Sequence, residues 1–393
     1  MGDDTVTPGG VGAAASVQIV RTEPEKARDA TASRRAALFA LQSRMRLVAL
    51  SQRERDCGRL VCVEHDPEIR VRSEDGCRRA SFNGLLRCGH VWTCAPCSQR
   101  IRARQAKRIA DAFSWLGGQC AMVTLTLRHN AGMQLKPTIR ALKGAWRRMR
   151  QRRDIRSIWK AVALAPVTAC EVKWSPGNGW HPHLHVAFKI GRTLRPEERD
   201  LFFVRWQEAI VAELGAAARP NDARGIVWSQ AFDADKEQDR ALYVAKLGLA
   251  LEVADPGLVK TGGGSASPFE IARAAADGDG QALARWREFY AATKGLHVLQ
   301  LSPEAAEAAR QAALERQADY LAEHANDEPP PPPDDFDVPT SAIRAMRSRE
   351  HRWPTVFHCA LVAAEQGGKD GFRRWLALHF PSHALDPPLR KTG

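Results

Sequence analysis

The chain has 393 residues, 44% of them hydrophobic, and a formal net charge of +13. This length can bury at least one full hydrophobic core and favours more than one domain, and the charge favours a polyanionic partner. No apolar run approaches the ~20 residues of a membrane span, and nine cysteines without a signal peptide argue against a secreted, disulfide-bonded protein. We therefore expect a cytoplasmic protein with reduced thiols.

Residues 1–33 are rich in Gly, Ala, Thr and charge without periodicity, and predict a disordered leader. An opening helix and short strands are expected after it. A cysteine cluster follows, in which the C-x2-C pair Cys94 and Cys97 has Cys88 close before it. Thiolates in this spacing are typical of a tetrahedral zinc site, so we predict structural Zn²⁺ here.

The fourth zinc ligand is less clear from the sequence. Cys57 is the preferred residue, because a glycine follows it directly, as a glycine follows Cys88. Cys77 and His90 are the alternatives. We assign the cluster to a zinc-binding module at residues 34–100.

A helix from Ser98 to Leu116 and a Thr-Leu-Thr strand are expected next, followed by a segment crowded with arginine between Trp146 and Trp159. Six arginines within ten residues repel one another unless counterions or a phosphate backbone screen them. This pattern favours phosphate contact over a merely solvated helix face. The predicted contact residues are Arg147, Arg148, Arg150, Arg152 and Arg153.

Residues 167–188 predict a β-hairpin, because two β-rich runs flank turn residues between Trp174 and Trp180. If these two tryptophans pair across the hairpin, Glu171 lies opposite His183 on the same face.

His183 and His185 alternate with Leu184, so both point to one face of the strand. With Glu171 they offer two imidazoles and one carboxylate, a set that favours Mn²⁺ or Mg²⁺ with open coordination positions. His181 shares this face and competes for the third position. A slip of one residue in the loop would remove Glu171 from the set.

A helix is expected at residues 238–249, with Asp239, Tyr243 and Lys246 on a face beside its apolar stripe. Such a tyrosine is ordinarily a core-edge residue. As a nucleophile, its phenol, with a pKa near ~10, needs a nearby cation. Lys246, one turn away, or the metal can supply it.

The Thr-Leu-Thr strand, the His-Pro-His-Leu-His run at 181–185 and the Tyr-Val-Ala-Lys run at 243–246 occur in an order that resembles HUH-superfamily rolling-circle replication initiators of bacterial plasmids. The similarity is greatest to the branch with an amino-terminal cysteine cluster, and it covers roughly residues 50 to 302. The His and Tyr motifs are specific in combination, whereas the strand is weak by itself.

The resemblance implies an α+β fold, in which a central antiparallel sheet is flanked by helices, and a metal-dependent site-specific DNA nicking-joining endonuclease. Tyr243 would attack single-stranded or hairpin origin DNA, leaving a 5′-phosphotyrosine and a 3′-hydroxyl for priming. Lys246 would balance developing charge. Asp239 would activate water in a terminating cleavage, unless it is only a helix N-terminal charge. A host helicase and polymerase would be partners.

The HUH domain is expected at 101–302, followed by a helix and polyproline linker at 303–335. Residues 336–393 predict a small helical domain whose role the sequence does not indicate. Two alternatives remain open, a single-strand transposase of the same superfamily and a non-catalytic zinc DNA-binding protein. Neither the origin sequence nor the oligomeric state follows from the sequence.

Overall fold

The computed structural model describes most of the chain. Part of the predicted leader, Lys246 and the polyproline run lie outside the described residues. The first helix, α1 (Glu23–Leu47), begins within the range predicted as a disordered leader, because after Pro24 its sequence consists mainly of good helix formers without glycine. The described residues are 23–62, 67–74, 77–221, 224–244, 264–323, 335–348 and 353–383.

A six-stranded antiparallel sheet forms the centre of the molecule, in the order β6-β3-β5-β4-β8 with β7 also paired to β3. The predicted α+β class with an antiparallel sheet flanked by helices is thereby confirmed. The strands are β3 (Gln119–Leu125), β4 (Ala163–Ser175), β5 (Gly179–Ile190), β6 (Ile226–Trp228), β7 (Phe232–Asp233) and β8 (Leu299–Leu301).

The β4–β5 hairpin has the predicted register. Trp174 pairs with Trp180, and Glu171 pairs with His183. Gly179 opens β5 with φ +71°, and a Cβ there would lie 2.8 Å from the Cα of Ala131. Glycine is required at this position both for the left-handed backbone and for the close approach of the neighbouring loop.

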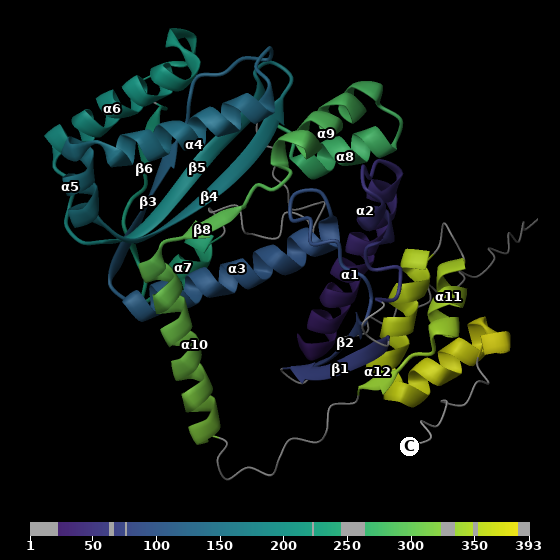
Figure 1. Ribbon diagram of the computed structural model, residues 1–393. Coiled ribbons are helices and arrows are strands. Elements are labelled where there is room, and N and C mark those ends of the chain that lie inside the picture. Colours follow the sequence, from purple (N-terminus) through teal and green to yellow (C-terminus); the bar gives the residue numbers. More distant parts are fainter. Residues whose placement is uncertain are drawn as a thin grey trace, which may run out of the picture.

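One face of the sheet carries α4 (Leu135–Gln151), α5 (Arg153–Val162) and α6 (Pro196–Leu214), with α4 and α6 packed side by side (Figure 1). The apolar residues that alternate with the histidines on β5 point to this face. Phe188, for example, lies 5.2 Å from Trp159 of α5 between ring centroids. These contacts form the largest hydrophobic core of the described residues.

The opposite face carries α3 (Ala95–Leu116), α7 (Glu237–Val244) and α10 (Pro303–Glu323). Lys189, on the same side of β5 as His183 and His185, donates to the carbonyl of Leu116 at the end of α3. Phe113 of α3 also packs edge-on against Phe232, which pairs with β3. The histidines therefore share their face of the sheet with α3.

Two further helices, α8 (Pro268–Ala276) and α9 (Gly280–Thr293), pack beside α4 near the hairpin turn. Trp180 of β5 stacks on Phe289 of α9, with centroids 5.7 Å apart. Trp286 donates from Nε1 to the carbonyl of Val48, 3.0 Å away, and so connects α9 to the end of α1.

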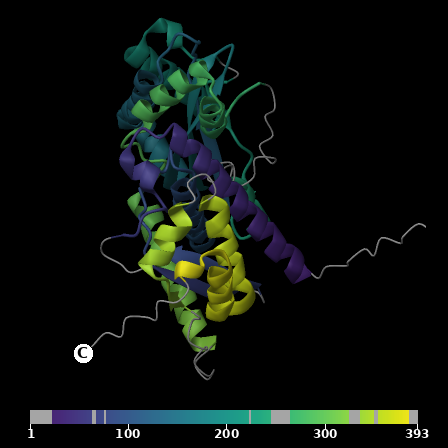
Figure 2. The same ribbon diagram turned by 90° about the vertical axis from the view of Figure 1, so that its right-hand side faces the viewer.

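The remaining elements form a second body, which we call the terminal unit (residues 67–85 and 335–383). Its hairpin of β1 (Glu68–Glu74) and β2 (Cys77–Asn83) pairs with β9 (Phe336–Asp337) and packs against α12 (Trp353–His379). Figure 2 shows α12 lying over the hairpin, with α1 alongside. The other short elements are α2 (Gln52–Asp56), α11 (Thr340–Ser348) and 3-10 turns at Ala216–Ala218 and Pro381–His383.

The terminal unit has its own core, in which Ile69, Val71 and Phe82 meet Trp353 and Phe357. The segment expected as a separate domain at residues 336–393 thus shares a core with a hairpin from the amino-terminal module. This packing buries the apolar face of the hairpin against the carboxy-terminal helices. No helix among the described residues has the length and apolarity needed to cross a bilayer.

Candidate metal centres and nucleic-acid interface

The β4–β5 hairpin brings together three of the predicted metal-ligating residues. Glu171 Oε2 lies 2.5 Å from His183 Nε2 and 2.9 Å from His185 Nε2. The two histidines are buried, and the glutamate is partly buried. We call these three side chains the sheet cluster. They meet because a register of paired strands places opposite residues on one face.

The contacts of the other ring nitrogen of each histidine, Nδ1, show how the sheet cluster could hold a cation. His185 Nδ1 lies 3.0 Å from Thr124 Oγ1. When Nδ1 donates to that hydroxyl, Nε2 presents its lone pair to the carboxylate, and a cation between them relieves the repulsion. His183 Nδ1 is buried and has no hydrogen-bond partner in the described part of the chain. The donor set of two nitrogens and one oxygen suits a divalent transition-type ion.

The surroundings of Glu171 and His185 also favour the protonation states in which these side chains bind a metal ion. Burial acts to raise the pKa of Glu171, but the hydrogen bonds with His183 and His185 and the charge of Lys173 Nζ, 3.0 Å away, hold it well below its usual range. Burial lowers the pKa of His185. A carboxylate beside neutral imidazoles is the protonation state in which these groups bind metal.

His181, the alternative third ligand, has a different partner. Its Nδ1 contacts His129 Nε2, while His129 Nδ1 lies 2.9 Å from the carbonyl of Asn178. The His181 and His183 ring centroids are 5.2 Å apart, so the pair lies at the edge of the sheet cluster. Burial lowers the pKa of His181 to about 4, helped by the neighbouring imidazoles of His183 and His129.

Tyr243 belongs to the last turn of α7, which packs against α3 on the same side of the sheet as the sheet cluster. The Tyr243 side chain and all of Lys246 lie outside the described residues. Asp239 is described, and its Oδ2 accepts a hydrogen bond of 3.3 Å from the backbone N–H of Asp233. That bond gives Asp239 a structural role at the turn before α7.

A second cluster forms where the loop after Cys57 meets the start of α3. The Cys57 sulfur lies 3.4 Å from that of Cys97 and 3.6 Å from that of Cys94, and the Cys88 and Cys97 sulfurs are 3.6 Å apart. Four ligands at about 2.3 Å from a tetrahedral zinc would have sulfurs about 3.8 Å apart. All four cysteines are buried, so the cluster can hold a metal such as zinc.

The amino end of α3 contributes to this cluster. Cys94 is the N-cap residue, and Cys97 lies in the first turn. Hydrogen bonds from the three neighbouring thiols lower the pKa of the Cys97 thiol, and the helix dipole favours a thiolate at this end. Of the alternative ligands, His90 Nδ1 lies 2.8 Å from Glu54 Oε1 and is engaged there. The side chain of Cys77 lies outside the described set.

The predicted phosphate-contacting arginines are exposed, at the end of α4 and the start of α5. They are therefore on the opposite side of the sheet from the sheet cluster. Arg148 pairs with Glu213 at 3.0 Å, Arg152 pairs with Glu208 at 3.4 Å, and Arg150 lies over the Trp146 ring. Acidic residues of α6 thus compensate part of the charge that the sequence presents as uncompensated.

Sequence reasoning missed three side chains around the sheet cluster. Lys173 follows Glu171 by two residues on the same strand, so the alternation of faces was a usable signal. Thr124 and His129 come from β3 and the loop after it, and no spacing in the sequence connects them to the hairpin.

Comparison with known proteins finds two curated relatives. The chain is 26% identical over 285 residues to a protein named "Protein rep" from Streptomyces lividans, covering 55% of this chain and 62% of the relative. It is 33% identical over 147 residues to a "Neomycin resistance protein" from Streptomyces cyanogenus, covering 30% of this chain and 33% of that protein. No family model and no solved structure matches. The chain spans less than two thirds of the length of either relative. Over the longer of the two matches it is similar to a Rep protein.

Proposed function

We propose that this protein is a rolling-circle plasmid replication initiator of the HUH superfamily. Residues 101–302 would form its nicking-joining endonuclease domain. The observation that carries the proposal is the sheet cluster, a carboxylate held between two imidazoles on adjacent antiparallel strands. The similarity to a Rep protein supports the same conclusion, and so does the net charge of +13, which suits a DNA partner.

Glu171, His183 and His185 would hold the catalytic Mn²⁺ or Mg²⁺. When bound, the ion supplies Lewis-acid polarisation of the scissile phosphate. Lys173, 3.0 Å from Glu171 Oε1, orients the carboxylate. The partial burial of these side chains keeps bulk water from competing with the DNA for the site.

Tyr243 would be the nucleophile. Its phenolic oxygen attacks phosphorus in single-stranded origin DNA and loses its proton to solvent, and the bond from phosphorus to the 3′-oxygen breaks. The 3′-oxygen takes up a proton and becomes the primer end, while the 5′-phosphate stays on the tyrosine. Lys246, three residues further along the sequence, would stabilise the developing charge. Asp239 is proposed as the carboxylate that activates water at termination.

The cysteine cluster of Cys57, Cys88, Cys94 and Cys97 would hold a structural Zn²⁺ outside the chemistry. Because Cys94 caps α3 and Cys97 lies in its first turn, the cluster ties the amino-terminal module to this helix. A host helicase and polymerase would act on the free 3′-end.

The decisive experiment compares the wild type with Tyr243→Phe. Each protein is incubated with single-stranded origin DNA and Mn²⁺, and the products are run on a denaturing gel. The variant keeps the ring but lacks the attacking oxygen, so we expect a covalent protein–DNA adduct only in the wild type. Tyr320→Phe, on α10, is the matched control and should form the adduct.

Two results would overturn the proposal. An adduct in Tyr243→Phe would mean that another residue is the nucleophile. DNA binding without any adduct in the wild type would favour a non-catalytic zinc DNA-binding protein, and joining of two separate DNA ends would favour the transposase.

A further inference from the structure

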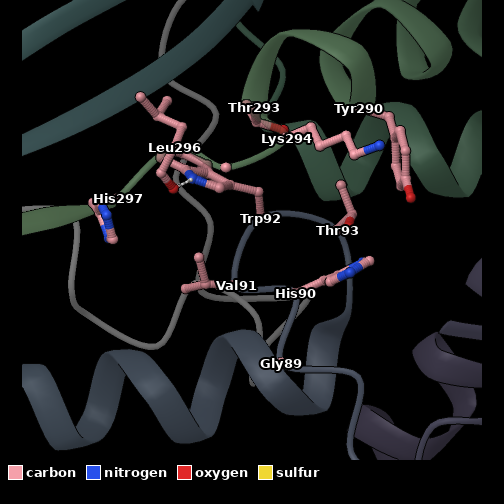
Figure 3. Close-up of a pocket in the computed structure, with 11 residues that line it drawn as sticks. Gly89, His90, Val91, Trp92, Thr93, Tyr290, Thr293, Lys294, Leu296 and His297 are labelled. Carbon is pink, nitrogen blue, oxygen red and sulfur yellow. Dashed lines mark hydrogen bonds between the residues drawn. The ribbon is translucent and has the colours of Figure 1, made fainter. Parts of the chain in front are cut away.

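A cavity of about 300 Å³ opens between the cysteine cluster and the end of α9. One wall is the loop from Gly89 to Thr93, which lies between the ligands Cys88 and Cys94. The other is the segment from Tyr290 to His297 (Figure 3). The indole N–H of Trp92 donates to the carbonyl of Leu296 at 2.8 Å and joins the two walls at the back.

The residues that line the cavity suit a ligand that carries both a negative charge and a flat ring. None of the 11 lining residues is acidic, and Lys294 and the two histidines His90 and His297 are among them. Lys294 is exposed and has no ion-pair partner within the described part of the chain. Glu54, a buried carboxylate that contacts this wall, is engaged by His90 and Thr93.

Two of these side chains are arranged as a pair. Tyr290 and Lys294 are four residues apart at the end of α9, and Figure 3 shows the lysine amine reaching toward the tyrosine ring. The Tyr290 ring is half-buried and meets His90 edge-on, with centroids 6.3 Å apart. One face of a ring held in this way is available for stacking, with a cation at its side.

The cavity wall leads into the sheet that carries the sheet cluster. β8 follows His297 directly and pairs with β4, with Leu299 opposite Ala169. The carbonyl of Val298 accepts a 2.9 Å hydrogen bond from the N–H of Cys170. If the pairing of β8 with β4 is continued by two residues before Leu299, His297 lies opposite Glu171. A DNA strand bound at the sheet cluster would therefore pass His297 to reach the cavity.

We infer that the cavity binds one unpaired nucleotide of the single-stranded DNA, with the base stacked on Tyr290 and its phosphate on Lys294. This inference rests on the proposed function for the identity of the ligand. Stacking on an aromatic side chain tolerates any base, and the lysine contributes a salt-dependent phosphate contact. Because the cysteine ligands frame one wall, metal binding there would also fix the shape of the nucleotide site.

The test measures binding of a fluorescent oligothymidylate to the full chain, without divalent metal, over a range of salt concentrations. Tyr290→Ala should weaken binding by about 5- to 100-fold at every salt concentration, whereas Tyr290→Phe should retain wild-type affinity. Lys294→Ala should reduce the slope of log K against log salt by about 0.7, the value for one phosphate on a single strand. Tyr320→Ala and Lys369→Ala, exposed residues outside the cavity, are the matched controls.

A second readout removes the ambiguity of a folding defect. An oligonucleotide containing 5-iodouracil should photocrosslink to the peptide that contains Tyr290 in the wild type. Wild-type affinity in Tyr290→Ala, or crosslinking only to peptides outside the cavity, would overturn the inference. So would equal weakening by Tyr290→Ala and Tyr320→Ala.

The outcome is separable from the proposed function. Adduct formation at Tyr243 is scored separately on single-stranded origin DNA with Mn²⁺ added. Loss of the adduct with an intact Tyr290 effect would leave a single-strand binding site in a protein that does not nick. An adduct with no Tyr290 effect would leave the nickase and remove the cavity from it.

Discussion

The sheet cluster and the terminal unit differ in how far along the chain their partners lie. Glu171 and His185 are separated by 14 positions and meet through one hairpin. Where α1 packs on the terminal unit, Arg35 and Glu365 are separated by 330 positions, and their atoms Nη1 and Oε1 lie 2.6 Å apart. Local strand register determines the first site, whereas the second depends on completing the fold. The contacts that form the sheet cluster and those that hold the terminal unit together therefore lie in different parts of the molecule.

The largest effect should come from breaking the sheet cluster. His183→Ala should reduce DNA cleavage by at least about 100-fold, because a ligand to the metal is lost. Thermal stability and DNA binding should change little, since most affinity comes from phosphate contacts. Cleavage and filter-binding assays on the same preparation check this.

Glu171→Gln is the sharper variant, because it keeps the shape and removes the charge. It should be inactive at low Mn²⁺ and partly recover at high Mn²⁺. Full activity at low metal would transfer the third-ligand role to His181. Equal loss of binding and cleavage in His183→Ala would mean that the histidines hold the fold.

Breaking the cysteine cluster should leave the sheet cluster working. Cys94→Ser or Cys97→Ser should lose bound zinc, because thiolate ligation contributes folding free energy directly, and proteases should then cut between residues 57 and 100. Elemental analysis of zinc per chain and cleavage of a short oligonucleotide are measured in parallel.

Residual cleavage without zinc fits a structural role for the cluster. Carefully reduced wild-type protein without zinc would contradict it. Cys57→Ser and Cys77→Ser decide the fourth ligand, and zinc should be lost only in the former.

The converse test destabilises the terminal unit and measures whether the strand that carries the histidines is affected. Trp353 is fully buried and packs edge-on against Phe357, so Trp353→Ala should cost about 3–5 kcal/mol of stability in this unit. Hydrogen exchange should speed up in β1 and β2, which come from the opposite end of the chain. Exchange in β5 should not change.

Trp353→Phe is the matched variant. It keeps an aromatic contact and removes an indole N–H that is buried without a partner among the described residues, so its cost should be smaller. Faster exchange in β5 for either variant would show that the two cores unfold together.

The smallest effect is expected from the arginines on the far side of the sheet. Arg147→Ala should lower the salt slope of duplex origin binding by about 0.9, the value for one phosphate contact. Arg148→Ala should change it less, because Arg148 is already paired with Glu213. Cleavage of a short oligonucleotide should not respond to either. A response in that assay would place the arginines beside the cleaved strand.

The hairpin could be predicted because its information is local. Two tryptophans and a turn set the register, and strand alternation then placed Glu171 with His183. The helix at 98–116 and the helix expected from residue 303 were predicted for the same reason, as α3 and α10 bear out. Thr124 and His129 were not, because contacts between strands 61 and 52 positions apart leave no spacing pattern.

The terminal unit shows the limit of reasoning by segment. Residues 336–383 have enough aromatic residues to suggest a core of their own, yet about a quarter of the buried residues in that core come from the segment 69–85, near the other end of the chain. Composition gives the number of apolar residues in each segment and does not say which segments pair. The ion pairs of Arg148 and Arg152 with α6 are a second example, since they depend on how two helices pack.

The shared core of the terminal unit has a consequence for how the protein is made. The β1–β2 hairpin leaves the ribosome about 250 residues before Phe336 and Trp353, which cover it. At a synthesis rate of about 5–20 residues per second, Ile69, Val71 and Phe82 remain without their packing partners for roughly 12–50 seconds. The central sheet is complete before then. A nascent chain arrested near residue 320 should therefore bind chaperones through this hairpin while its central sheet is already folded.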